Sequence, residues 1–321
     1  MSKRLQLEDV ERARRTIAAH LPPTPLRRSF AVPGGNTYLK LECWQPTGSF
    51  KVRGATNHLS ALTEEQAAHG VVAASAGNHA LGVAFAAQAL GGRVAATLFV
   101  PVTAPRSKVE KLRAFPVTVR ETGASYDDAH AAAMEHVART GGRYVHAYED
   151  PLTAAGQGTI GLEILEELPD VGAILVPVGG GGMIAAIATV VKAKAPHVRI
   201  VGLQPEASPS LRESIARGEA LLQYPAGPTL ADGIAGGIGE IAFTHRDLID
   251  EVVIMPESEI ESAIVALIAS DQVVAEGSGA VGIAALRCGA FSPRDGRPVV
   301  AVVSGGNIDA RVLARLLHDS A

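Results

Sequence analysis

Lys51 is the side chain of this sequence with the clearest capacity for covalent chemistry. It lies in the segment QPTGSFKVRGA, residues 45–55, where a proline, glycines and an aromatic residue lead into a helical stretch. A lysine in such a setting can be removed from water, which leaves its amine uncharged and nucleophilic. A lone lysine is by default a surface residue, so the interpretation of Lys51 depends on the turns elsewhere in the chain.

A run of four glycines, Gly179, Gly180, Gly181 and Gly182, followed by Met183, separates an apolar stretch from a helical one. Glycine lets the backbone approach an anion closely, and a helix start adds unpaired N–H groups and a positive dipole end. No Lys-Ser/Thr pair follows, so the run is not a P-loop. A flexible connector is the alternative, but a strand that enters a helix directly favours a phosphate cradle.

Two other turns also follow expected strands. Ser75, Gly77, Asn78 and His79 lie in the turn SAGNH, and Ser304 opens the turn SGGN. Ligands of open α/β sheets gather at the carboxyl ends of the strands, so the first turn could hold a carboxylate or a phenolic oxygen. The alternatives are a plain helix cap by a side chain of the first turn, a packed histidine, and an ordinary tight turn at Ser304.

Short β-branched runs alternate with Ala-rich helical stretches along the chain. The pattern predicts strands at 71–75, 95–100, 117–119, 173–178, 200–203 and 299–303, and helices at 78–90, 104–114, 125–140, 158–168 and 183–195. Such alternation is typical of an α/β fold with parallel sheets, helices on both faces and right-handed crossovers.

The composition limits the possible partners. A chain of 321 residues, with 47% hydrophobic and 19% charged residues, is long enough for two core-bearing units. A net charge of -4 offers no basic surface for nucleic acid, so we expect a small-molecule partner. Residues 1–17 have helical spacing unlike a signal peptide, and no apolar run suffices for a membrane span. With two isolated cysteines, Cys43 and Cys288, these features predict a cytoplasmic protein.

The motifs PTGSFKxRGA, SAGNHA, the tetraglycine loop and SGGN, in this order, resemble the fold-type II enzymes that use pyridoxal 5'-phosphate (PLP). Among these the chain is similar to the threonine/serine dehydratase (ammonia-lyase) and serine racemase family, from about Pro22 to Asp309. The resemblance implies two domains, each an open, mostly parallel twisted sheet with helices on both faces. A large PLP-binding domain would comprise residues 1–48 and 149–321, and a small substrate-closing domain residues 49–148. A homodimer or higher homo-oligomer is also implied.

Carried over residue by residue, the resemblance assigns roles to the motif positions. Lys51 would be the catalytic residue and form a Schiff base with PLP. The implied cofactor-binding residues are Phe50, Lys51, Asn78, Gly179, Gly180, Gly181, Gly182, Met183 and Ser304. The implied substrate-binding residues are Ser75, Gly77, Asn78, His79, Leu81 and Tyr148.

The activity implied is α,β-elimination of water from a 3-hydroxy-L-amino acid, giving a 2-keto acid and ammonia. Ser304 would face the pyridine nitrogen, where a hydroxyl favours prompt elimination over transamination. Racemisation needs a second acid where this chain has Ala76, so racemase activity should be weak. Gln204 and Ser210 replace two carboxylates of a divalent-cation site, so we predict no metal there. The short chain after SGGN predicts no C-terminal regulatory domain.

Two positions bear on the choice of substrate. Leu81 stands where the family usually has glutamine, and Ala147, often proline in relatives, precedes Tyr148. This favours a bulkier substrate such as phenylserine or hydroxyaspartate, unless Leu81 only packs in its helix. Other fold-type II activities, racemisation or a β-replacement synthase, are alternatives. A regulator that binds a nucleotide or phosphometabolite through the same glycine loops is an alternative of another class, but it would give Lys51 no function.

Overall fold

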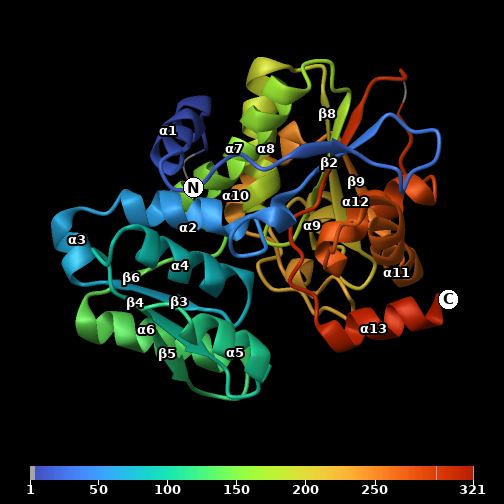
Figure 1. Cartoon of the computed structure of the whole chain (residues 1–321). Helices are drawn as coiled ribbons and strands as arrows, with labels where there is room; N and C mark the ends of the chain where they lie inside the picture. The colour runs from blue at the N-terminus through green and yellow to red at the C-terminus, as the bar shows by residue number, and fades with distance from the viewer. Residues whose placement is uncertain (1–3, 294, 321) are drawn as a thin grey trace.

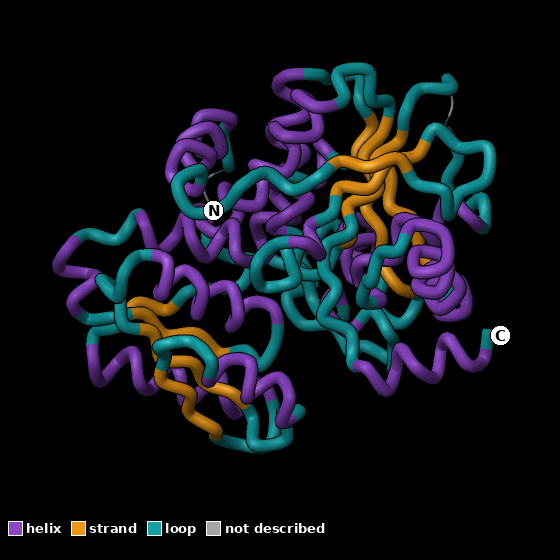
Figure 2. The backbone as a smooth tube through the Cα atoms, viewed as in Figure 1, coloured by secondary structure: helices purple, strands orange, loops and turns teal. Residues whose placement is uncertain are grey.

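The computed structural model describes residues 4–293 and 295–320. Two separate β-sheets organise these residues, and helices surround each sheet (Figures 1 and 2). The predicted α/β class with two mostly parallel sheets is therefore confirmed. In the described residues, no helix combines the length and apolarity needed to cross a bilayer.

The strands and helices have the following bounds. The strands are β1 (Leu26–Arg28), β2 (Thr37–Lys40), β3 (Val71–Ala74), β4 (Ala96–Val100), β5 (Thr118–Glu121), β6 (Arg143–Tyr144), β7 (Ala173–Pro177), β8 (Arg199–Pro205), β9 (Glu251–Met255) and β10 (Val299–Val302). The α-helices are α1 (Leu7–Ile17), α2 (Lys51–Ser60), α3 (Glu64–Ala68), α4 (Asn78–Ala89), α5 (Arg106–Arg113), α6 (Tyr126–Thr140), α7 (Pro151–Glu167), α8 (Gly182–Lys194), α9 (Ser210–Arg217), α10 (Glu240–Thr244), α11 (Glu257–Ala266), α12 (Gly277–Arg287) and α13 (Ala310–Asp319). Short helical turns are η1 (Glu42–Trp44), η2 (Asp232–Ile234), η3 (Arg246–Leu248) and the π-turn η4 (Leu267–Asp271).

The larger sheet has the strand order β1-β2-β10-β7-β8-β9, and only β1 and β2 pair antiparallel. Successive residues of the central strand β7 face opposite sides. Ile174 and Val176 pack in one core with α7 and α8, whereas Leu175 packs in another with α11 and α12. Because both faces are covered, this strand is apolar throughout its length, as its sequence indicated.

The smaller sheet has the order β5-β4-β3-β6, with all strands parallel. Val71 and Ala73 of β3 pack with α2, α4 and α5, and Val72 and Ala74 pack with α6. In Figure 1 this unit, cyan to green, occupies one end of the molecule, and the larger sheet lies at the other. The domain boundaries at 48/49 and 148/149 stay a prediction.

The predicted elements are present with shifted ends, but one boundary was wrong. Helix α7 begins at Pro151 rather than at 158, with Asp150 as its N-cap. Gly156 and Gly158 lower the helix propensity of this stretch, and tertiary packing overrides it. A Cβ at Gly156 would lie 2.7 Å from the Arg53 carbonyl oxygen, because α2 crosses α7 closely there.

Strands β1, β2, β6 and β9 were not predicted, and the two-residue β6 has little pattern to detect. At the N-terminus the helical spacing of residues 1–17 becomes α1, which starts at Leu7. Residues 1–3 of that expectation lie outside the described residues.

A cluster of buried charges joins α2 to the larger sheet. Arg53 is 1% exposed, and its guanidinium donates to Glu42 at 2.8 Å and to Glu163 Oε2 at 2.8 Å. Lys40 on β2, also buried, lies 2.7 Å from Glu163. The two cations balance the two carboxylates, so α2, which begins at Lys51, is held by ionic contacts that water does not weaken.

We predict that Arg53→Met lowers the free energy of unfolding by about 3–5 kcal/mol, because two carboxylates lose their buried partner. Urea denaturation of the purified protein measures the change. Arg106→Met is the matched control, since the Arg106–Glu110 pair is exposed and should contribute little. A similar, small effect for both variants would contradict a structural role of the cluster.

Candidate active site

The loop that carries Lys51 is tied to the carboxyl end of β10. The N–H of Phe50 donates to the Ser304 carbonyl at 3.1 Å, and the N–H of Gly306 donates to the Gly48 carbonyl at 2.9 Å. Ser49 and Gly305 form an isolated antiparallel bridge between them. The segment that carries Lys51 and the SGGN turn are thus joined by backbone contacts.

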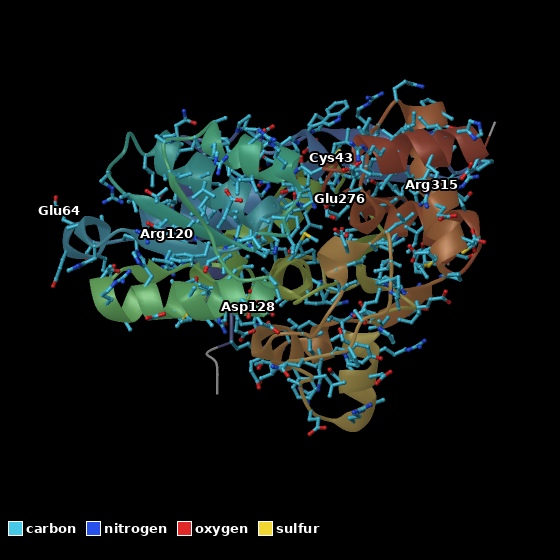
Figure 3. All side chains as sticks on the ribbon, turned by 90° about the horizontal axis from the view of Figure 1, so that it is seen from below. Cys43, Glu64, Arg120, Asp128, Glu276 and Arg315 are labelled. Carbon is cyan, nitrogen blue, oxygen red and sulfur yellow. The ribbon has the colours of Figure 1, made fainter. Side chains whose placement is uncertain are left out.

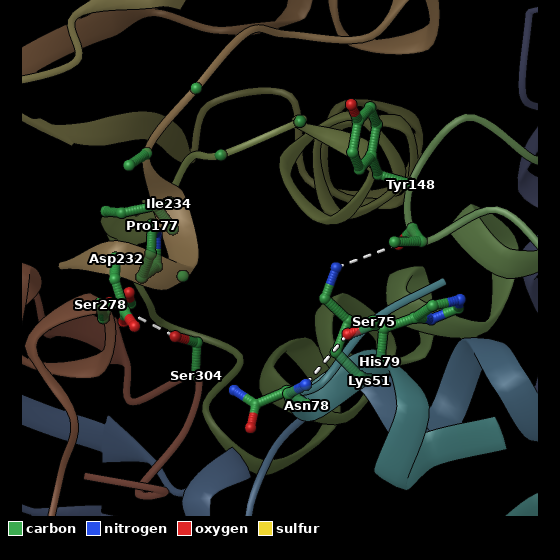
Figure 4. A pocket seen from close by; sticks show the side chains of 18 of the residues that line it. Lys51, Ser75, Asn78, His79, Tyr148, Pro177, Asp232, Ile234, Ser278 and Ser304 are labelled. Carbon is green, nitrogen blue, oxygen red and sulfur yellow. Dashed lines mark hydrogen bonds between the residues drawn. The ribbon is translucent and has the colours of Figure 1, made fainter. Parts of the chain in front are cut away.

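The Lys51 amine points into an open space below Tyr148 (Figure 4). Its Nζ donates to the Ala147 carbonyl at 3.0 Å and lies 5.1 Å from the centre of the Phe50 ring. The side chain is partly accessible from the cavity, but most of its surroundings are protein atoms. This burial lowers the pKa of the amine from 10.5 to about 8, against an opposing effect of the Glu276 carboxylate.

Asn78 is held in one orientation by two partners. Its Nδ2 donates to Glu276 Oε1 at 2.9 Å, and its Oδ1 accepts from Asn307 Nδ2 at 2.8 Å. A primary amide has two N–H bonds, so within the described residues one N–H remains for an acceptor in the cavity. An N–H of this kind could be donated to a phenolic oxygen.

Glu276 is a cavity residue that the sequence reasoning missed. It immediately precedes α12 and is 9% exposed. In Figure 3 it lies near the centre of the molecule. Burial raises the pKa of its carboxyl to about 7, and nearby Asp232 adds to the rise. A signal was present, because Glu276 is the only charged residue between Asp271 and Arg287.

The tetraglycine loop presents backbone to the cavity. Gly181, with φ +82°, precedes α8 and gives it no side-chain cap, so the first N–H groups of the helix are open to an anion. A Cβ at Gly180 would lie 2.2 Å from the Tyr148 ring, and one at Gly182 would lie 2.7 Å from the Tyr148 carbonyl oxygen. Only glycine fits between the cavity and Tyr148.

The SAGNH turn places a second uncapped helix start beside Lys51. Gly77 precedes α4 without a side-chain cap, and its own N–H donates to Ser75 Oγ at 3.1 Å. The His79 Nε2 lies 2.8 Å from the Val145 carbonyl oxygen. Burial lowers the pKa of His79 to about 3, so its ring is a neutral, packed group, and its backbone N–H belongs to the turn.

All the sequence-predicted site residues line one cavity of about 990 Å³ between the two sheets (Figure 4). They are Phe50, Lys51, Ser75, Gly77, Asn78, His79, Leu81, Tyr148, Gly179, Gly180, Gly181, Gly182, Met183 and Ser304. Ser304 is 3% exposed and its hydroxyl donates to the Ser278 carbonyl at 3.4 Å, a long bond that a better acceptor could replace. The individual roles of these residues stay predictions.

At the positions considered for a divalent cation, Gln204 Nε2 donates to Ser210 Oγ at 3.1 Å. Across the described part of the chain, no three or more His, Cys, Asp or Glu side chains gather as metal ligands would. The prediction that this protein uses no metal here is not tested by that finding.

The chain belongs to the pyridoxal-phosphate dependent enzyme family, whose sequence model matches residues 17–305. It is 45% identical over 321 residues to an L-threonine ammonia-lyase of Thermotoga maritima, a match covering 98% of this chain and 78% of that protein. A Geobacter sulfurreducens L-threonine ammonia-lyase is 48% identical over 280 residues, covering 86% and 68% of the two chains. The structure of maize serine racemase superposes with a TM-score of 0.92 at 32% identity, covering 99% of this chain and 98% of that one.

The cavity fits the cofactor of this family. An accessible lysine amine of lowered pKa can bind an aldehyde, and the glycine loop with the α8 start can bind a phosphate. The oriented Asn78 amide offers one N–H to a ring oxygen. Ser304, which follows the carboxyl end of β10, offers a hydroxyl to the same cavity. The fold-type II assignment made from the motifs is confirmed at the level of the family.

We predict that the rate at which the cofactor-free protein reacts with PLP rises with pH, has its midpoint near pH 8 and then levels off. Below its pKa the Lys51 amine is protonated and unreactive, and above it the neutral fraction is saturated. Stopped-flow measurement of the visible absorbance that PLP gains on reaction with a lysine gives this rate.

Free Nα-acetyl-lysine in the same buffers is the control for the titration of PLP itself. Its amine has the ordinary pKa of about 10.4, so its rate should keep rising over the whole range. Parallel profiles for protein and free lysine would show that burial does not lower the pKa of Lys51.

Proposed function

We propose that the protein is a PLP-dependent threonine dehydratase, which eliminates water from L-threonine or L-serine and releases ammonia with a 2-keto acid. The observation that carries the proposal is the Lys51 amine, deeply set beside a phosphate cradle, with its pKa lowered to about 8. The names of the bacterial relatives, L-threonine ammonia-lyases at 45% and 48% identity, supply the substrate.

When bound, PLP supplies an electron sink that makes the substrate Cα–H acidic and helps the β-hydroxyl to leave. Lys51 would hold the cofactor covalently, and Gly179–Gly182 with Met183 would hold its phosphate. The neutral Lys51 amine at Nζ would accept the Cα proton and return a proton to the departing hydroxyl. The Ala147 carbonyl, 3.0 Å from Nζ, orients this amine.

The SAGNH turn would bind the substrate carboxylate through the helix start at Asn78. Because the Gly77 N–H is already used by Ser75, we assign this contact to the following N–H groups and to the turn as a whole. Neutral His79 contributes no positive charge, since its ring is committed to the Val145 carbonyl.

Two side chains favour elimination over other outcomes. Ser304 would place a neutral hydroxyl at the pyridine nitrogen, where it could not hold a proton as a carboxylate would, and this would favour elimination over transamination. Ala76, within the SAGNH turn, lines the cavity, and its methyl group cannot deliver a proton to a second face of Cα. We therefore propose that racemisation is slow compared with dehydration.

A second candidate is a dehydratase for a bulkier 3-hydroxy amino acid, such as phenylserine or hydroxyaspartate. Leu81 lines the cavity and is 7% exposed, and Tyr126, Tyr148 and Tyr224 line it as well. An aromatic substrate would gain apolar contacts there. Leu81 also belongs to the core of the smaller unit, which is the packing role considered from the sequence.

We predict that the protein releases ammonia and 2-keto acid from L-threonine or L-serine without any second substrate. Lys51→Ala should lower kcat by about 10³-fold or more, because both proton transfer and cofactor attachment are lost. Lys194→Ala, an exposed lysine paired with Glu11, is the matched control and should retain full activity.

A panel of threonine, serine, hydroxyaspartate and phenylserine isomers separates the candidates. The highest kcat/KM on threonine or serine supports the first proposal, and the highest on phenylserine or hydroxyaspartate supports the second. No ammonia from any of them would exclude a dehydratase and favour a β-replacement synthase or a racemase.

We further propose that the chain forms a homodimer or higher homo-oligomer. Trp44 is 47% exposed and Val274 is 45% exposed. Their segments meet, since a Cβ at Gly306 would lie 3.2 Å from Cys43 and 2.6 Å from the Val274 carbonyl oxygen. Exposed apolar surface of this kind is typical of association sites.

We predict that Trp44→Glu shifts the sedimentation coefficient from that of an oligomer to that of a monomer, because a buried, unpaired charge opposes association. Leu317→Glu on α13, a site 39% exposed, is the control and should leave the assembly unchanged. A wild-type protein that sediments as a monomer would remove the proposal.

The cytoplasm is the proposed compartment. Cys43 and Cys288 are free thiols in the structure, and Cys43 is buried. Unpaired cysteines are typical of reducing compartments.

A further inference from the structure

Gln204 is a buried amide that connects the glycine loop to helix α9. It lies near the carboxyl end of β8 and is 0% exposed. Its Nε2 donates to the Val178 carbonyl at 3.2 Å and to Ser210 Oγ at 3.1 Å. Its Oε1 accepts from the N–H groups of Leu211 at 2.9 Å and Arg212 at 3.3 Å. All four hydrogen-bonding positions of the amide are thus in use.

Helix α9 depends on this residue for its N-terminal cap. The position before the helix is Pro209, which makes no side-chain cap. Two of the orphan N–H groups of the first turn, those of Leu211 and Arg212, are satisfied instead by Gln204, from a different element. The side chain therefore fixes the start of α9 to the strand end that lies beside the loop.

The contacts continue from α9 back to the glycine loop. Four hydrogen bonds, connected to one another through the intervening residues, make this path. In order they are Ser214 Oγ to the Ser210 carbonyl at 2.6 Å, Leu221 N–H to Ser214 Oγ at 3.1 Å, Ile238 N–H to the Leu221 carbonyl at 3.0 Å, and Gly239 N–H to the Gly180 carbonyl at 2.9 Å. The path starts at Val178 and ends at Gly180, so it closes a circuit around the first residues of the loop.

We propose that Gln204 is a positioning residue for the phosphate cradle. It touches neither the cavity nor a substrate, but it holds the Val178 carbonyl that immediately precedes Gly179. A loop of four glycines has many accessible conformations, and an anion that must order it binds less tightly. Gln204 restricts the loop to one conformation before the phosphate arrives.

The proposal rests on the cofactor of the family and not on threonine as the substrate. It is tested in the cofactor-free full-length protein by titration with PLP and with pyridoxal, which lacks the phosphate. Gln204→Leu should weaken PLP binding by about tenfold, the effect of losing about one net hydrogen bond of positioning. Pyridoxal binding should change by less than about twofold.

Gln204→Glu gives a second readout that general destabilisation would not produce. A protonated glutamic acid can donate to the Val178 carbonyl, whereas the ionised carboxylate has no proton to donate and repels that oxygen. The wild-type amide does not titrate. We therefore expect the ratio of the PLP dissociation constants, variant over wild type, to increase as the pH rises.

Ile264→Ala is the control for loss of stability, because Ile264 is buried in α11, in the core on the other face of the larger sheet. It should lower the unfolding midpoint, and it should change the dissociation constants of PLP and pyridoxal by the same factor. If Gln204→Leu does not fold, Ser210→Ala removes one link of the same circuit and is compared in the same way. Equal changes for PLP and pyridoxal, or unchanged PLP binding in folded variants, would overturn the proposal, whatever the enzyme's substrate.

Discussion

Desolvation of one amine is the constraint on which the rest of this structure depends. Lys51 must lie deep enough for its pKa to fall to about 8, yet remain open to a cavity from which a cofactor can reach it. Removing an ammonium group from water costs free energy, so the backbone around Lys51 has to be held in place by other interactions. The hydrogen bonds from Phe50 and Gly306 to the Ser304 and Gly48 carbonyls, and the Arg53 ion cluster, supply that restraint.

The same desolvation acts on the opposite charge across the cavity. Burial raises the pKa of Glu276 to about 7 while it lowers that of Lys51 to about 8, so both groups are driven toward their neutral forms. Asn78 is bonded directly to Glu276, so the protonation of this carboxyl is sensed by an amide that also faces the cavity.

The parts of the site that sequence could predict are those whose signal is local. A strand, a glycine-containing turn and a helix start are consecutive in the chain, so the tetraglycine loop and the SAGNH turn were visible in the sequence. The start of α7 was misplaced although Asp150 as N-cap and Pro151 as the first helical residue mark it locally, because Gly156 and Gly158 lower the helix propensity of the turns that follow. The close approach of α2 explains why glycine stands at 156. Glu276 was missed for a related reason, since its partner Asn78 lies 198 positions away.

The four glycines of the tetraglycine loop do not by themselves indicate an anion site. Gly180 and Gly182 are needed to let Tyr148 pack, Gly181 adopts φ +82°, and a Cβ at Gly179 would lie 3.0 Å from Ile234 Cα. Each glycine thus has a steric reason that involves no ligand. What indicates an anion is that α8 begins there without a side-chain cap and faces a cavity containing a lysine of lowered pKa.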